Sequence, residues 1–166
     1  MADTVPSVGD FTSVPLRNRL RMELDAPASE VWDLMGDMSR FPEYSSGLER
    51  VEAQRDDNGR CTGYTCYFKP IEEGAEALVS RDVMKWYEPN RGYLSAEIEG
   101  DTGTERTVAF MTLEPVGNRT RLTYDMHFDA EDLDVMKAAI NEVNLDMADN
   151  LIRRFGGRVS ERYMTS

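Results

Sequence analysis

The feature that most constrains this chain is a long middle stretch of strand-type sequence. From residue 48 to residue 128, apolar and polar residues alternate with a period of two, and clusters of turn-forming residues interrupt the pattern. The pattern predicts six consecutive strands, approximately at 48–55, 62–69, 76–87, 92–99, 104–114 and 119–128. Consecutive strands joined by short turns pair as antiparallel neighbours, so the middle of the chain is predicted to be an antiparallel meander.

The segments on either side of the meander predict one more strand and several helices. Residues 17–24 (RNRLRMEL) alternate polar and apolar side chains, which predicts a first strand. Helical spacing of apolar residues predicts a short helix over 27–38, and 41–47 is a break with one further helical turn. A single apolar face marks a long helix over 133–155, after which the tail is expected to continue helically or to fray.

This order of elements predicts an α+β fold with one core. A strongly curved, seven-stranded antiparallel sheet can wrap around one long C-terminal helix, with two short helices after the first strand. The space between sheet and helix is then an apolar pocket. The length of 166 residues and a hydrophobic content of 40% suit a single core. We expect a flexible N-terminal segment at 1–14 and one domain at 15–166.

Charge and composition exclude several classes of function. The 19 basic and 31 acidic residues give a formal net charge of −12, which repels phosphate backbones, so no nucleic acid partner is expected. No basic, apolar leader opens the chain and no apolar run approaches a membrane span, which predicts a cytoplasmic protein without membrane insertion. Cys61, Cys66 and an outward-facing, exposed His127 cannot supply a zinc site, and no phosphate loop is present. We therefore expect no metal and no cofactor.

Three stretches carry a resemblance to a known superfamily. The early segment APASEVWDLMGDMSRFPEY, the last hairpin LEPVGNRTRLTYDMHFD and the helix end ADNLIRRF resemble the START-like (SRPBCC) helix-grip superfamily, specifically its bacterial polyketide cyclase/dehydrase group. The resemblance covers residues 17 to about 155. It implies the helix-grip fold, with the early helices closing the pocket mouth. It also implies a small hydrophobic ligand, because the superfamily includes lipid and sterol carriers, aromatase/cyclases, quinone-binding proteins, co-chaperones and drug-sequestering proteins.

The resemblance implies a partial catalytic set. Similar aromatase/cyclases carry a serine on this strand, an arginine two residues later and an asparagine near the end of the long helix. Here LVSRDV supplies Ser80, but Asp82 stands at the arginine position and Arg81 lies one place off, while ADNLIRRF supplies Asn150. A tyrosine that those enzymes carry after the Phe-Pro-Glu stretch has no direct match, and Tyr44 is the possible substitute.

Asp82 has two interpretations. If it faces the pocket, desolvation raises the pKa of its carboxyl group and it can act as an acid or base. Otherwise it forms an ion pair with an arginine of a neighbouring strand or points to solvent. The candidate catalytic residues are Asp82, Ser80, Tyr124 and Asn150. The candidate ligand-binding residues are Tyr44, Met84, Trp86, Thr107, Met111, Met126, Asn144, Met147 and Leu151, although the methionines among them also suit an ordinary core.

The sequence thus predicts a protein, monomeric or homodimeric, that binds a small hydrophobic molecule of polycyclic or polyketide-like character. The pocket could also catalyse cyclisation or dehydration of that molecule. Two different functions stay open: a non-catalytic carrier or sequestering protein for a lipid, sterol, quinone or drug, and a co-chaperone-type interaction module.

Overall fold

The structure, a computed structural model, describes residues 4–70 and 72–164. The strands are β1 (Leu16–Leu24), β2 (Leu48–Arg55), β3 (Cys61–Phe68), β4 (Val79–Glu88), β5 (Gly92–Gly100), β6 (Glu105–Val116), β7 (Arg119–Asp129) and β8 (Gly157–Met164). The α-helices are α1 (Ala28–Met35) and α2 (Leu133–Phe155), and short 3₁₀ helices form η1 (Val8–Asp10) and η2 (Met38–Glu43).

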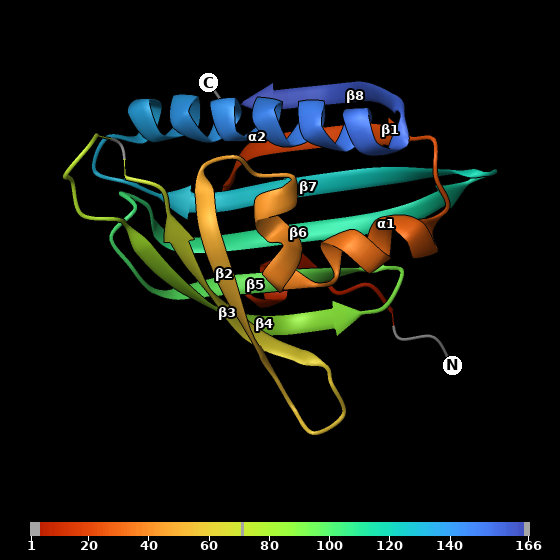
Figure 1. Cartoon of the computed structure of the whole chain (residues 1–166), viewed down its shortest axis with the longest axis horizontal. Coiled ribbons are helices and arrows are strands. Elements are labelled where there is room, and N and C mark those ends of the chain that lie inside the picture. The colour runs from red at the N-terminus through yellow and green to blue at the C-terminus, as the bar shows by residue number, and fades with distance from the viewer. Residues whose placement is uncertain (1–3, 71, 165–166) are drawn as a thin grey trace.

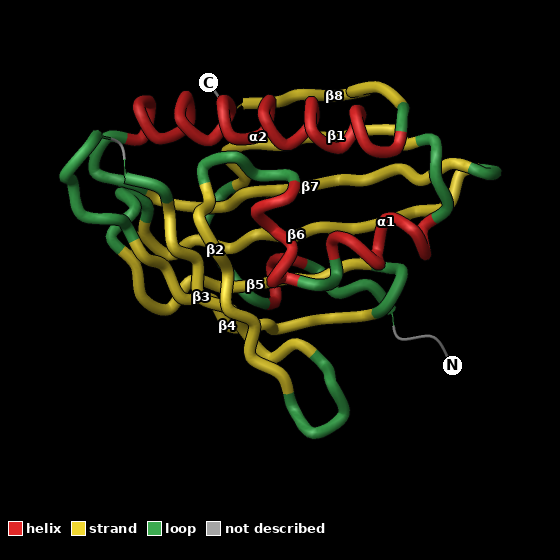
Figure 2. The backbone as a smooth tube through the Cα atoms, in the orientation of Figure 1, coloured by secondary structure: helices red, strands yellow, loops and turns green. Residues whose placement is uncertain are grey.

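The strands form one antiparallel sheet in the order β2-β3-β4-β5-β6-β7-β1-β8. The sheet curves so strongly that the β2–β3 hairpin comes forward over the strands behind it (Figure 1). The helices α1, η2 and α2 all lie on the concave side, which we call the inner face of the sheet, and α2 runs along β1 and β8 (Figure 2). The α+β helix-grip architecture predicted from the sequence is confirmed.

The sheet has one strand more than predicted. The tail after α2 neither continues helically nor frays within the described residues; it forms β8, which pairs antiparallel with β1. The reversal depends on two glycines with positive φ, 78° at Gly156 and 129° at Gly157. A β-carbon at Gly157 would lie 2.1 Å from the carbonyl oxygen of Glu23, so the strand can approach β1 only because this residue lacks a side chain.

Helix α2 spans the residues predicted for it, whereas α1 ends at Met35, three residues before the predicted end of the short helix. In α1, Pro27 precedes the first turn and the buried residues are Val31, Trp32, Leu34 and Met35. The Asp132 carboxylate accepts a hydrogen bond from the Val135 N–H and caps the start of α2. The core between helices and inner face includes Leu20, Met22 and Leu24 of β1 together with Met147 and Leu151 of α2. No helix in the part of the chain described here is both long and apolar enough to span a membrane.

The outer face of the sheet is covered locally by the N-terminal segment. The prediction that His127 is exposed is wrong: its side chain is buried at 6% exposure, and Nδ1 lies 2.9 Å from the carbonyl oxygen of Val14. Strand alternation does set His127 on the outer face, but Val14 is itself buried there and covers the histidine. Residues 1–3 of the predicted flexible segment lie outside the described residues, and its flexibility stays a prediction.

Candidate functional site

A cavity of about 430 Å³ lies between the inner face of the sheet, the connection from η2 to β2, and α2. Most of its wall is apolar. Its lining residues are Phe41, Ser45, Gly47, Leu48, Tyr64, Cys66, Phe68, Lys69, Leu78, Ser80, Asp82, Glu97, Thr102, Thr104, Thr107, Ala109, Tyr124, Met126, Met136, Ala139, Ile140, Val143, Asn144 and Met147.

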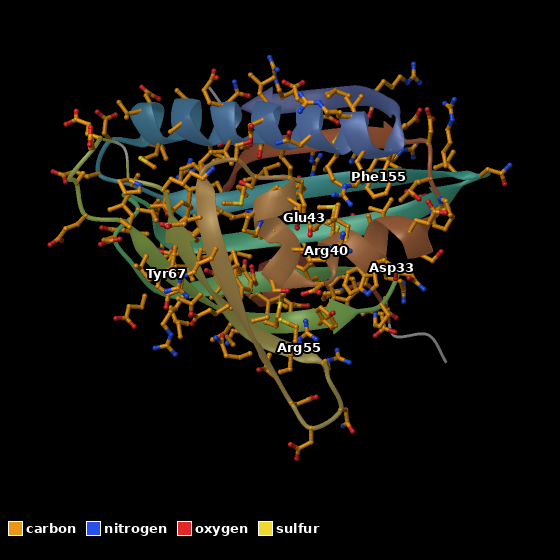
Figure 3. The ribbon with its side chains drawn as sticks, in the orientation of Figure 1. Asp33, Arg40, Glu43, Arg55, Tyr67 and Phe155 are labelled. Carbon is orange, nitrogen blue, oxygen red and sulfur yellow. The ribbon has the colours of Figure 1, made fainter. Side chains whose placement is uncertain are left out.

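Polar contacts fasten η2 to its neighbours and so fix this side of the cavity. The Glu43 carboxylate accepts hydrogen bonds from Arg40 at 2.6 Å and from Arg154 of α2 at 2.8 Å. Glu43 and Arg40 lie just below α2 in Figure 3. Arg55 of β2 forms an ion pair with Asp37 at 2.9 Å. Because the side chains of these ion pairs are partly exposed, the pairs add little to the free energy of unfolding. Their main effect is to hold η2 in position.

Two carboxyl groups face each other across neighbouring strands in the cavity wall. Asp82 of β4 is the register partner of Glu97 of β5, and both line the cavity. Tyr64 of β3 donates a hydrogen bond from its hydroxyl group to Asp82 Oδ2 at 3.3 Å, and the same hydroxyl lies 2.8 Å from Ser95 Oγ. Within the described residues, neither carboxyl group has an arginine or lysine as an ion-pair partner. The ion-pair interpretation of Asp82 is therefore contradicted, and the carboxyl group faces the cavity.

The environment moves the pKa of both carboxyl groups towards neutrality. Burial raises the pKa of Asp82 to about 6, although hydrogen bonds from Tyr64 and Ser95 act in the opposite direction. Burial also raises the pKa of Glu97 to about 7, and the negative charges of Asp82 and Asp101 contribute to that shift. Because the two groups interact, they titrate as a pair. The pair can hold, release or accept a proton near neutral pH.

The tyrosine and cysteine side chains in the wall remain neutral at that pH. Burial raises the pKa of the Tyr64 and Tyr124 hydroxyl groups, so both stay protonated and can donate hydrogen bonds. Burial raises the pKa of the Cys66 thiol to about 12, which leaves no thiolate for nucleophilic chemistry. In the described part of the chain, no three His, Cys, Asp or Glu side chains are grouped as a metal site would require.

The wall formed by α2 contributes a buried amide to the cavity. Asn144 is buried at 1% exposure, and neither its Nδ2 nor its Oδ1 has a hydrogen-bond partner among the described residues. Buried amides normally form hydrogen bonds, so this one is an exception that a ligand could satisfy. Asn144 therefore adds a donor and an acceptor to the cavity on the side opposite the sheet.

Asn150 does not line the cavity. Its Nδ2 donates to the carbonyl oxygen of Tyr44 at 3.3 Å and lies 3.2 Å from Ser46 Oγ. The Ser46 N–H donates in turn to Asp146 of α2 at 2.8 Å. These bonds hold the connection between η2 and β2 against α2. In this position Asn150 holds the η2–β2 connection beside the cavity. The resemblance implies instead that it contacts a substrate.

The prediction that Trp86 faces the cavity is wrong. The register between β4 and β5 shifts between Met84 and Trp86, which is a bulge at Lys85. Beyond the bulge Trp86 lies on the outer face, with its ring 6.0 Å from that of Phe110. Tyr87 faces inward instead, and its hydroxyl group donates to the Gly36 carbonyl oxygen at 2.7 Å.

The remaining candidates fall into two groups. Six predicted site residues besides Asp82 line the cavity: Ser80, Tyr124, Thr107, Met126, Asn144 and Met147. Four others lie in the core beside it without lining it: Tyr44, Met84, Met111 and Leu151. Sequence reasoning missed Glu97 and Tyr64. The inward alternation of Tyr93, Ser95 and Glu97 along β5 is the pattern that could have found Glu97.

The fold and the cavity define a helix-grip protein with a mostly apolar cavity between a curved sheet and a C-terminal helix. Residues 17–156 match the family described as "Polyketide cyclase / dehydrase and lipid transport", and the chain belongs to that family.

Solved structures with low sequence identity share the fold. A START superfamily protein from Mycobacterium smegmatis is 16% identical, with a TM-score of 0.71 over 85% of this chain and 97% of the other. The Zhui aromatase/cyclase from a Streptomyces species is 12% identical, with a TM-score of 0.70 over 84% and 93%. A major latex-like protein from Panax ginseng is 8% identical, with a TM-score of 0.61 over 84% and 97%. No curated protein matches the sequence.

Proposed function

We propose that this protein binds a small, largely apolar molecule, polycyclic or polyketide-like, in the cavity between the sheet and α2. The cavity itself carries the proposal, because its volume of about 430 Å³ and its apolar wall suit a ligand of a few fused rings. The small set of polar groups, Asp82, Glu97, Tyr64 and Asn144, would orient the ligand by its oxygen or nitrogen atoms.

Acid–base chemistry on the bound molecule is the enzymatic form of this proposal. A cyclisation or dehydration needs one group that donates a proton and another that accepts one. Asp82 and Glu97 have pKa values of about 6 and about 7, and the Tyr124 hydroxyl could hold a carbonyl oxygen. Family membership and the fold of the Zhui aromatase/cyclase support this form.

A non-catalytic carrier or sequestering protein is the second candidate. The described residues that line the cavity include no arginine, whereas the resemblance implies one that would hold an enolate oxygen. Arg81, the nearest arginine in the sequence, pairs with Glu99 on the exposed outer face at 3.4 Å. Asn150 is also engaged elsewhere. A pocket without these two groups binds by shape and apolar contact, which is sufficient for a carrier.

Filling the cavity tests whether it binds anything. Ala109 of β6 is buried in the wall, so Ala109→Phe should occupy the space of the ligand. We expect the variant to lose at least about tenfold in affinity for the neutral fluorescent probe Nile red, because a tenfold loss requires only about 1.4 kcal/mol. Ala138→Phe, on the exposed side of α2, is the matched control and should bind as the natural chain does. Equal binding by all three proteins would contradict the proposal.

Native mass spectrometry of the protein purified from its host separates a small-molecule binder from an interaction module. A retained small molecule that Ala109→Phe lacks supports a binding protein or enzyme, and a retained protein partner supports a co-chaperone-type module. A short poly-β-carbonyl thioester then distinguishes enzyme from carrier. An enzyme should cyclise it, and Asp82→Asn should reduce turnover by about 10²-fold or more.

A further inference from the structure

The carboxyl pair of Asp82 and Glu97 lacks a counter-charge from the described part of its own chain. Lys69 is the basic residue among those lining the cavity, and its side chain is exposed to solvent. The groups that face the pair from β3 are Tyr64 and Cys66, and from β7 Tyr124; all three are uncharged near neutral pH. Asp101, after β5, adds a further negative charge near Glu97.

The helix side of the cavity is uncharged as well. The described lining residues of α2 are Met136, Ala139, Ile140, Val143, Asn144 and Met147, none of which carries a charge. Asn144 is buried there with both polar atoms unpartnered among the described residues. A carboxyl pair on one wall and an unsatisfied amide on the other point to a ligand with polar groups. Among the described residues the carboxyl pair has no opposite charge, and Asn144 has no hydrogen-bond partner.

We infer that the ligand carries a basic nitrogen, held as an ammonium group by the Asp82 and Glu97 carboxylates, with a second polar group hydrogen-bonded to Asn144. The rest of the ligand would be the apolar body that the remainder of the wall contacts. This inference rests on the proposed function, and it names the chemical class of the ligand: an apolar molecule bearing an amine.

The electrostatics of the site favour a cation over a neutral ligand. Two like charges in a desolvated site are costly, and an opposite charge between them offsets that cost. A bound ammonium group would favour the deprotonated pair, so the proton held by the free pair would be released to solvent on binding. The formal net charge of −12 would also draw cations towards the protein.

A matched pair of probes tests the inference. Naphthylmethylamine is a cation at pH 8, and naphthylmethanol has nearly the same shape without the charge. Displacement of Nile red, or calorimetry, should show the amine binding at least about tenfold more tightly than the alcohol, which corresponds to about 1.4 kcal/mol. The affinity of the amine should rise from pH 6 to pH 8 as the pair loses its proton, while that of the alcohol should not.

Two variants on the same strand assign the preference to the pair. Glu97→Gln should remove most of the preference for the amine over the alcohol. Glu99→Gln changes net charge equally but acts on an exposed side chain paired with Arg81, so it should keep the preference. Binding of the alcohol as tightly as the amine, or an amine preference unchanged in Glu97→Gln, would overturn the inference while Nile red binding still supported the proposed function. If the cavity binds neither Nile red nor either naphthyl probe, both the inference and the proposed function would be contradicted.

Discussion

Asp125, which is buried, and Asp82, which is half-buried, lie on opposite faces of the same sheet and have opposite kinds of surroundings. Asp125 of β7 lies on the outer face, where both of its carboxylate oxygens accept hydrogen bonds from Arg19 of β1, at 2.7 and 2.8 Å. Asp82 lies on the inner face, where a tyrosine hydroxyl is 3.3 Å away and its register partner on the next strand is another carboxyl residue. Arg19 neutralises the charge of Asp125, whereas Asp82 has no cationic partner among the described residues and lines the cavity.

The difference is the one expected between a structural charge and a ligand-binding one, the role that we propose for Asp82. A bidentate arginine–carboxylate pair fixes the register of β1 against β7 and has no remaining capacity for a ligand. An unpaired carboxyl group in a desolvated wall reduces the stability of the fold when it is charged, and such groups cluster at functional sites. The same comparison holds for the two buried asparagines Asn18 and Asn144. The Nδ2 of Asn18 donates to the Lys137 carbonyl oxygen at 3.0 Å, so only its Oδ1 lacks a partner in the described residues, whereas both polar atoms of Asn144 lack one.

Breaking the outer pair should have the largest effect. Arg19→Met keeps much of the side-chain length but leaves the Asp125 carboxylate buried without its partner. We expect the free energy of unfolding to fall by about 3 kcal/mol, as for other broken buried pairs. Urea denaturation at pH 7 measures it. In Arg81→Met, which breaks the exposed pair with Glu99, the change should stay within about 0.5 kcal/mol. Equal losses of stability in Arg19→Met and Arg81→Met would show that Asp125 is no more desolvated than Glu99.

Removing the inner charges should have a smaller effect of opposite sign. The pKa values of Asp82 and Glu97 are raised in the folded state, from 3.8 to about 6 and from 4.5 to about 7. Between about pH 4 and pH 7 the folded protein therefore binds more protons than the unfolded chain, so their contribution to stability falls as pH rises through that window. The double variant Asp82→Asn/Glu97→Gln should be more stable than the natural chain by about 1–2 kcal/mol at pH 8.

The pH dependence of that gain is its control. At pH 4 both carboxyl groups are largely protonated in the folded protein, so most of the gain should be absent when the same denaturation experiment is repeated there. A double variant that is less stable than the natural chain at pH 8 would show that the pair contributes favourable contacts that outweigh its desolvation.

The sequence predicts the framework of the fold because its periodic segments are long. The alternation in the meander and the apolar face of α2 each depend on many residues, so single exceptions do not change the interpretation. The missed strand β8 (GRVSERYM) has no regular alternation of apolar and polar residues. Its position depends on the positive φ values of Gly156 and Gly157, which residue identity permits but does not require. The covering of His127 by Val14 is a contact between distant segments, which strand alternation alone does not contain.

The candidate site was predicted less completely, and two local features explain why. The bulge at Lys85 reverses which side chains face inward, so Trp86 moves to the outer face and the alternation that correctly places Asp82 fails four residues later. On α2, Asn144 and Asn150 are six residues apart, which at about 100° per residue sets them about 120° apart around the helix. One lines the cavity and the other contacts the connection from η2 to β2, and the apolar pattern of the helix does not distinguish them.

The smallest predicted effect sharpens the comparison between the two buried asparagines. Asn144→Leu replaces an unsatisfied amide by an apolar group of similar volume, so the free energy of unfolding should be unchanged or higher by up to about 1 kcal/mol. Asn18→Leu removes a donor from the Lys137 carbonyl oxygen and should lower the free energy of unfolding by about 1–2 kcal/mol. Thermal and urea denaturation of both variants measure the difference. If Asn144→Leu is as destabilising as Asn18→Leu, the Asn144 amide has a role in folding, and its place among the ligand-binding groups of the cavity would have to be withdrawn.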